Sequence, residues 1–334
     1  MVLRAEGGMQ APKDEGRAAS STAEGKAAAA APASAATDER GKTVGRGGFE
    51  GGRLVVVPTP LGNLGDMTAR SLDALRAADT VCAEDTRVTG KLLAAFGIQK
   101  RLERLDEALA AQRAAGIARR VLDGEVIAYC SDAGMPGVSD PGMRLVRACR
   151  AEGAPVEVLP GPTAVATAYV ASGCENQRFY FGGFFPRKAG ERRSLLESLR
   201  ALDAALVFYE SPNRLEGALE AIAEAFPLRE AAVCRELTKL HEEIVRAAAP
   251  ELRDEFARRA ANGGIKGEIV IVIDGPSAEE GVAQAQHAAN DARERARQLA
   301  AEGVRAKQIA KTIAGELGIP RNEAYEIALE AGRS

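Results

Sequence analysis

The chain has 334 residues, 46% of them apolar, which is long enough for two ordinary domains with real hydrophobic cores. Its 44 Lys and Arg residues face 47 Asp and Glu residues, so the net charge of −3 argues against a protein coated in basic surface that grips naked nucleic acid. Only 4% of residues are aromatic and Trp is absent, which disfavours a stacking platform for single-stranded nucleic acid.

Residues 1–52 are rich in Ala, Gly and Ser and contain few large apolar side chains. Burial could not offset the entropy lost on ordering, so a disordered extension is predicted. The acidic residues Glu6, Asp14 and Glu15 are atypical of a transit peptide, and no secretory apolar segment precedes them. The sequence contains no run of 18 or more apolar residues that could form a membrane span. We therefore expect a soluble cytoplasmic protein.

From Leu54 onward, short β-branched runs alternate with helical patterns, which predicts an α/β architecture with largely parallel strands. Helices are expected between the strands, for example over 68–78 and 106–122. The strands are predicted near 54–57, 80–83, 126–130 and 156–159, and then near 179–182, 205–209, 231–235, 243–246 and 268–273. The two series predict an N-terminal domain over 53–162 and a C-terminal domain over 163–276.

A C-terminal tail is predicted over 285–334, after a polar, Ala-rich linker that follows Gly275. Its helical part is expected to begin at about Ala288. Ile309, Ile313 and Leu317 fall on one helical face, and Gly318 can supply the positive-φ stop before a second helix over 321–329. This outline is that of a helix-turn-helix. A helical hairpin that packs on the body or on a second subunit fits equally well, because the charges of the tail nearly balance.

The cysteines are odd in number, widely spaced and set in apolar surroundings, whereas a metal site needs clustered ligands. They are Cys82, Cys130, Cys149, Cys174 and Cys234. We interpret them as reduced core thiols. With only two histidines in the chain, no metal centre is expected.

The first candidate ligand loop, PTPLGNLGDMT over 58–68, leaves a strand and enters a helix. In an open α/β sheet, ligands bind in the crevice at the carboxyl ends of the strands. Neither GxGxxG nor GxxxxGK[ST] occurs in the chain, so dinucleotide and P-loop sites lack their usual phosphate cradle. Asp66 or Thr68 could instead serve only as a helix cap.

The second loop, SDAGMPGVSDPG over 131–142, directly follows the strand over 126–130. Three glycines and two prolines allow a compact loop whose backbone approaches a ligand, while Asp132 and Asp140 offer acceptors for ribose hydroxyls or an ammonium. The alternative is a long turn in which Asp140 caps a helix. In a third loop, LPGPTA over 159–164, Thr163 could cap a helix, donate to a ligand, or do both.

Together with AEDTR over 83–87, YESPNR over 209–214, CRELTK over 234–239 and GEIVIV over 267–272, these loops resemble the tetrapyrrole methylase superfamily. Within this class of S-adenosylmethionine-dependent methyltransferases, the blocks most closely resemble the branch that methylates cytidine 2′-hydroxyls of small-subunit ribosomal RNA. The resemblance covers residues 54–275, and the tail resembles the extra helical segment of that branch. Precorrin and uroporphyrinogen methylases carry a glycine-rich first loop, and the different loop here favours the ribosomal branch.

The resemblance implies two α/β/α domains with mixed, mostly parallel sheets, a cofactor cleft between them, and a C-terminal helical extension. It implies a homodimer that uses S-adenosylmethionine to methylate a cytidine ribose in the decoding region of 16S rRNA, within the small ribosomal subunit, without a metal. The implied cofactor-binding residues are Pro58, Leu61, Ser131, Asp132, Ala133, Gly134, Met135, Val138, Thr163, Ala164, Tyr209, Leu237 and Gly267.

Methyl transfer to a ribose hydroxyl requires alignment and a group that accepts the proton or stabilises the alkoxide. The catalytic candidates are Lys239, Glu236, Glu84, Asp85 and Arg87, with Glu210 as a further carboxylate. Lys239 is the foremost candidate, either as a cation or as a neutral amine base. Alternatively, Arg87 with Asp85 and Lys239 with Glu236 could be structural ion pairs.

A basic cluster follows the aromatic strand that contains Phe179, Tyr180, Phe184 and Phe185, and it is a candidate RNA contact. It consists of Arg187, Lys188, Arg192 and Arg193. These cations could grip phosphates, or they could belong to a solvated helix start. The sequence leaves two alternative functions: methylation of a free tetrapyrrole, and nucleic-acid-binding regulation without catalysis.

Overall fold

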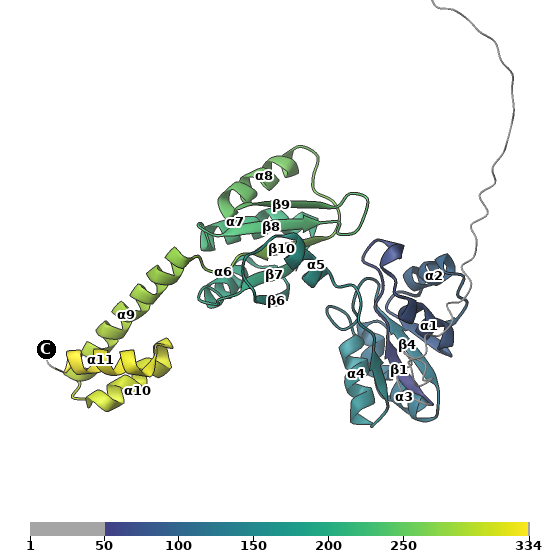
Figure 1. Cartoon of the computed structure of the whole chain (residues 1–334), viewed down its shortest axis with the longest axis horizontal. Coiled ribbons are helices and arrows are strands. Elements are labelled where there is room, and N and C mark those ends of the chain that lie inside the picture. Colours follow the sequence, from purple (N-terminus) through teal and green to yellow (C-terminus); the bar gives the residue numbers. More distant parts are fainter. Residues whose placement is uncertain (1–50, 333–334) are drawn as a thin grey trace, which may run out of the picture. The chain divides into compact units, whose positions relative to one another are not determined.

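The computed structural model describes residues 51–332, except for the side chains at 278–279, 282–285 and 287–288 in one helix. Its first sheet has the strand order β3-β2-β4-β1-β5, and all its strand pairs are parallel. Figure 1 labels β1 and β4 of this sheet. These strands are β1 (Arg53–Val56), β2 (Thr80–Ala83), β3 (Arg101–Arg104), β4 (Val126–Cys130) and β5 (Val156–Val158). The predicted extension over 1–52 lies outside the described residues apart from its last two positions.

Helices cover both faces of the first sheet, which explains why its strands are almost continuously apolar. The helices are α1 (Ala69–Ala77), α2 (Thr86–Ala95), α3 (Glu107–Leu122) and α4 (Gly142–Ala151), with the 3₁₀ turn η1 (Leu64–Asp66) ahead of α1. Within β1, Leu54 and Val56 pack in the core beneath α3 and α4, whereas Val55 joins Leu75 of α1 in the opposite core. Burial on both faces leaves only the strand ends and their loops available for a ligand.

The second sheet has the order β6-β7-β10-β8-β9, in which β6 and β7 are parallel and the other pairs are antiparallel. Its strands are β6 (Phe179–Phe184), β7 (Ala205–Glu210), β8 (Glu230–Arg235), β9 (Glu243–Ala248) and β10 (Ile269–Ile273). One face packs against α6 (Ala189–Ser198), α7 (Leu215–Ala225) and α8 (Ala249–Ala261), and the other packs against α5 (Ala164–Ala171). The 3₁₀ turn η2 (Pro212–Arg214) precedes α7.

The predicted α/β fold class is therefore confirmed: two helix-flanked sheets, one all parallel and one mixed, in which parallel pairs predominate overall, and a helical C-terminal region. Every predicted strand is present, but β3 was not predicted. Its sequence, RLER, is polar and partly exposed, because β3 is an edge strand that pairs only with β2. An edge strand does not show the apolar run on which the prediction depended.

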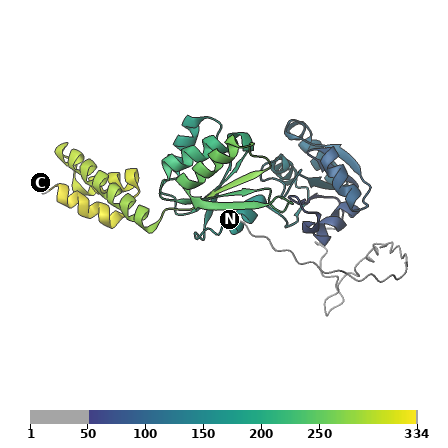
Figure 2. The same cartoon turned by 90° about the horizontal axis from the view of Figure 1, so that it is seen from above.

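The tail consists of α9 (Ala278–Ala301), α10 (Ala306–Leu317) and α11 (Arg321–Ala331), which lie side by side (Figure 2). As predicted, Ile309 and Ile313 are buried in a core shared by the three helices, and Gly318 ends α10 at φ 67°. The predicted linker is wrong, because a capping box between Ser277 and Glu280 starts α9 ten residues before Ala288. Nucleic-acid binding by this helix-turn-helix outline stays a prediction.

The described cysteines are all free thiols, four of them buried and Cys174 half-buried. Burial raises the pKa of the Cys130 thiol to about 12, so it is inert near neutral pH. Among the helices between residues 51 and 332, none is long and apolar enough to cross a membrane. Over the same residues, no group of three or more His, Cys, Asp or Glu side chains has the geometry to hold a metal ion.

Candidate functional site

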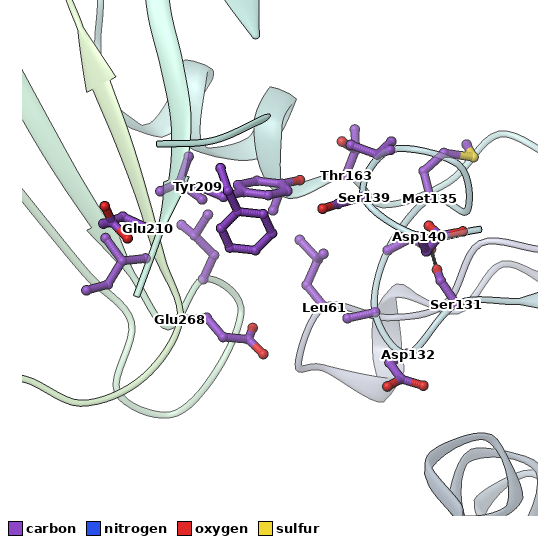
Figure 3. Close-up of a pocket in the computed structure, with 18 of the residues that line it drawn as sticks. Leu61, Ser131, Asp132, Met135, Ser139, Asp140, Thr163, Tyr209, Glu210 and Glu268 are labelled. Carbon is purple, nitrogen blue, oxygen red and sulfur yellow. Dashed lines mark hydrogen bonds between the residues drawn. The ribbon is translucent and has the colours of Figure 1, made fainter. Parts of the chain in front are cut away.

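A cavity of about 380 Å³ is lined by loops from both sheets (Figure 3). Every residue predicted to bind the cofactor lines it except Pro58. Figure 3 shows Leu61, Asp132 and Thr163 on one side, and Tyr209 and Glu268 on the other. A cavity of this size falls within the usual range for small-molecule sites. The three predicted loops therefore converge on one candidate ligand site.

The first two loops are joined by backbone hydrogen bonds at the floor of the cavity. Thr59 N donates to the Gly134 carbonyl at 3.0 Å, and Gly134 N donates back to the Thr59 carbonyl at 3.1 Å. Gly134 has φ 77°, and a Cβ atom there would lie 3.0 Å from Leu61 Cδ2. A glycine is therefore needed where the second loop approaches the first. Pro58 takes no part in the lining, but it packs tightly against Gly161 of the third loop.

The Asp140 carboxylate organises the second loop. It accepts hydrogen bonds from Gly137 N at 2.7 Å, from Gly142 N at the start of α4 at 2.8 Å, and from the Tyr129 hydroxyl at 3.2 Å. Asp140 therefore supports the start of α4 and also lines the cavity, and its predicted contact with a ligand stays a prediction. The capping interpretation also holds for Thr68, whose Oγ1 accepts from Ser71 N at 3.1 Å to start α1.

The charged groups that line the cavity are all acidic. They are Glu84, Asp132, Asp140, Glu210 and Glu268, and no Lys, Arg or His is found among the lining residues of the described chain. Burial raises the pKa of Glu84, and the neighbouring Asp132 and Asp140 carboxylates raise it further. An acidic wall without cations disfavours phosphorylated ligands and favours a cationic one.

Glu210 lines the cavity, but its carboxylate is enclosed by protein. Its Oε1 accepts from Ser211 N at 2.7 Å and from Arg214 Nε at 2.6 Å. Its Oε2 is buried and has no hydrogen-bond partner among the described residues. The Arg214 guanidinium and the Ser211 backbone therefore hold this carboxylate in place, and its oxygens are not exposed to a ligand.

The predicted catalytic residues Lys239 and Glu236 form an ion pair beside the cavity and do not line it. Lys239 Nζ lies 2.9 Å from Glu236 Oε1 and 3.1 Å from Glu268 Oε2, and Glu268 does line the cavity. The stem of Lys239 packs against the first loop, where a Cβ on Gly62 would fall 2.2 Å from Lys239 Cγ. Two non-glycine residues in this turn, Glu236 at φ 52° and Thr238 at φ 66°, are strained, as is common at functional sites.

The protonation state of Lys239 decides between its two predicted roles. Burial lowers its pKa, but hydrogen bonds to Glu236 and Glu268 outweigh burial, so that the pKa is raised overall. The side chain is therefore an ammonium near neutral pH. A neutral amine that acts as a general base is disfavoured, whereas a positioning or charge-stabilising cation remains consistent with the geometry.

Glu84, Asp85 and Arg87 are adjacent in the sequence, but only Glu84 lines the cavity. Asp85 caps α2 by accepting from Arg87 N at 2.8 Å, and its Oδ2 lies 2.6 Å from Arg87 Nη2. These hydrogen bonds from Arg87 lower the pKa of Asp85. Asp85 and Arg87 therefore form the structural ion pair that was the alternative interpretation. Glu84 lines the cavity, and no ion pair involves it within residues 51–332.

One of the four cations predicted to contact RNA is buried. Arg187, Lys188 and Arg193 are exposed. Arg192 is only 7% exposed, its Nε donates to the Pro186 carbonyl at 2.7 Å, and its guanidinium lies 5.7 Å from the centroid of the Phe185 ring. Arg192 therefore supports the start of α6 and is not positioned to grip a phosphate.

Several lining residues were not predicted as ligand contacts, notably Phe184, Ser139 and Glu268. Glu268 directly follows Gly267 in the GEIVIV block, and this adjacency to a predicted cofactor residue was the detectable signal. Phe184 belongs to an aromatic strand whose orientation depends on an irregularity that no periodicity reveals.

The chain matches the family model described as tetrapyrrole (corrin/porphyrin) methylases over residues 53–253. It is 40% identical to ribosomal RNA small subunit methyltransferase I of Escherichia coli O157:H7, over 84% of this chain and 95% of the relative. The protein of the same name from Halalkalibacterium halodurans is 37% identical, over 83% of this chain and 94% of the relative. That from Thermotoga maritima is 42% identical, over 67% of this chain and 99% of the relative.

Solved structures show the same fold at low sequence identity. A diphthine synthase superposes with a TM-score of 0.53 at 16% identity, covering 69% of this chain and 93% of that chain. The methyltransferase CobJ superposes with a TM-score of 0.52 at 20% identity, covering 67% of this chain and 94% of that chain.

Proposed function

This chain belongs to the tetrapyrrole (corrin/porphyrin) methylase family and is a methyltransferase, and from that premise we propose that it methylates a cytidine 2′-hydroxyl of 16S rRNA. The observation that carries the proposal is the 37–42% identity to small-subunit ribosomal RNA methyltransferases, at a coverage of 94% or more of each relative cited above. The likeness to a methyltransferase such as CobJ is below 25% identity and supports only the fold. Methylation of a free tetrapyrrole is therefore the weaker alternative.

The cavity suits S-adenosylmethionine as the methyl donor. This donor carries a sulfonium and an ammonium, and the cavity offers carboxylates without any basic lining residue in the described chain. Apolar side chains such as Leu61, Val138 and Leu237 form much of the rest of the wall. The residues present therefore fit the cofactor that the family implies.

The donor, when bound, supplies an electrophilic methyl group for in-line displacement. The chain must hold the ribose hydroxyl in line, which can contribute roughly 7–11 kcal/mol. We assign proton acceptance to Glu84, because it lines the cavity and its raised pKa makes it a stronger base than an ordinary carboxylate. The Lys239 ammonium, held by Glu236 and Glu268, is a positioning residue at the edge of the site.

Arg187, Lys188 and Arg193 are exposed at the start of α6, which supports the proposal that they contact RNA phosphates. As in the branch that the sequence resembles, we also propose that the protein acts as a homodimer on the small ribosomal subunit. Sedimentation of the purified chain, alone and with subunits, tests these two assemblies.

Ribose methylation of 16S rRNA in cells with and without this gene tests the proposed function. Loss of one 2′-O-methyl cytidine, restored by the purified protein with S-adenosylmethionine, is expected. Gly134→Val should abolish cofactor binding in calorimetry, because the side chain would meet Leu61 in a left-handed conformation. An unchanged methylation map, together with activity on a free tetrapyrrole, would overturn the proposal.

A further inference from the structure

Strand β6 contains an extra residue next to the cavity. Phe181 pairs with Val207 of β7, but the next aligned pair is Phe184 with Tyr209, so three steps along β6 match two steps along β7. The inserted residue forms a β-bulge, which reverses the side-chain alternation beyond it. Bulges of this kind often re-aim side chains near binding sites.

Two glycines make the bulge possible. A Cβ on Gly182 would lie 2.2 Å from the Phe208 ring, and Gly183 has φ 72°, which disfavours any larger residue. Beyond them, Phe185 enters the core beneath α6 and α7, with its ring centroid 4.9 Å from that of Phe208. Phe184 instead lies against Tyr209, with ring centroids 5.5 Å apart.

The consequence is an exposed aromatic ring on the rim of the cavity. Phe184 lines the cavity and is nevertheless 59% exposed, in a chain with few aromatic residues. The apolar wall further in, for example Leu237 at 7% and Val270 at 5%, is almost fully buried. A ring that is left exposed at the rim is placed to meet a second substrate.

The residues that follow Phe184 favour a nucleic acid as that substrate. Arg187 is exposed, and no ion pair involves it within residues 51–332. Lys188, next along the chain, is also exposed and pairs only with the local Glu191 in this part of the chain. A flat apolar ring followed three residues later by a free cation matches a nucleotide, whose base stacks while its phosphate pairs.

We propose that Phe184 stacks on the nucleobase of the nucleotide that is methylated and so holds its ribose at the mouth of the cavity. This inference rests on the proposed RNA-methylating function and specifies which residue positions the substrate. A target base in folded RNA must leave its stack to reach an enclosed site, and a ring at the rim would compensate for part of the lost stacking.

The test compares Phe184→Ala, Phe184→Leu and Phe184→Trp, with Tyr180→Ala as a matched control. Tyr180 is another exposed aromatic residue of β6, but it does not line the cavity. Two quantities are measured with small ribosomal subunits that lack the modification: the dissociation constant and kcat/KM. Calorimetry gives the affinity for S-adenosylmethionine.

Phe184→Ala should lower kcat/KM for subunits by roughly ten- to a hundredfold, the usual effect of losing one base–aromatic stack. Its affinity for S-adenosylmethionine should stay within about twofold of the original. Trp should restore most of the rate, Leu should not, and Tyr180→Ala should resemble the unaltered enzyme.

Equal loss of cofactor affinity and activity in Phe184→Ala would mean that the ring contacts the cofactor, and would overturn the inference. Full activity of Phe184→Leu would show a merely apolar contact and overturn it as well. If the unaltered enzyme binds S-adenosylmethionine but leaves subunits unmethylated, the proposed function itself fails and the inference fails with it. If both the unaltered enzyme and Phe184→Ala are fully active on subunits, the inference is wrong but the proposed function stands.

Discussion

Two acidic regions border the same cavity and differ in how their charges are satisfied. On the side of the first sheet, Glu84 and Asp132 have raised pKa values, with burial as the largest cause. On the side of the second sheet, Glu236 is held by Lys239, and hydrogen bonds from Lys239 lower its pKa. Both regions look alike in the sequence. Among the described residues, the first region contains a cavity-lining carboxylate with a raised pKa and no ion pair, Glu84, which fits the proposed role of proton acceptor.

The largest effect is expected from Glu84→Gln, which keeps the shape of the side chain but removes its basicity. If Glu84 accepts the ribose proton, single-turnover methylation should fall by about 10²- to 10⁴-fold, with unchanged affinity for S-adenosylmethionine. Asp85→Asn is the matched control, because this neighbour caps α2 and does not line the cavity. A rate in Glu84→Gln equal to that of the control would remove Glu84 from the mechanism.

The pH dependence of kcat/KM sharpens the same assignment. The active form of a general base is deprotonated, so kcat/KM should rise with pH through the pKa of Glu84 and fall as the pH drops below it. Because burial raises this pKa above the ordinary value of 4.5, the acid limb should lie above that of an unperturbed carboxylate. Glu84→Gln should flatten the limb. A limb that persists unchanged in Glu84→Gln would assign it to another group.

A smaller effect is expected from substitutions at Lys239, which pairs with Glu236 and with the cavity-lining Glu268. Lys239→Ala should lower the rate by about tenfold, because a cation that orients the site is lost. Lys239→Arg should keep part of the rate, since Arg also carries a positive charge. Single-turnover rates that are equally low in the Arg and Ala variants would instead indicate proton acceptance by the lysine.

The smallest effects are expected at the basic cluster. Each Ala substitution at Arg187, Lys188 or Arg193 should reduce the salt slope of RNA binding by about one unit and leave cofactor affinity unchanged. Arg192→Ala should leave the slope alone and lower the melting temperature, because Arg192 is buried against Phe185 and Pro186. A salt slope that changes only in Arg192→Ala would reverse this assignment.

Much of the fold was predictable because burial on both faces gives the central strands β1, β2 and β4 continuous apolar runs. The edge strand β3 carries no such signal, and α9 begins with a capping box inside a polar, Ala-rich segment that resembles a linker. The three ligand loops were predictable as well, because glycine and proline patterns at strand ends are local features of the chain.

The sequence by itself determined the family, the loops that meet at the cavity and the residue types available for chemistry. The tertiary structure alone decided which charges are already paired: Arg87 pairs with Asp85 and the Lys239 ammonium pairs with Glu236, whereas Glu84 has no ion pair in the described part of the chain. It also decided that Arg192 is buried and that a bulge turns Phe184 toward the cavity rim. The physical reason is that pairing, burial and side-chain direction depend on neighbours that are distant along the chain.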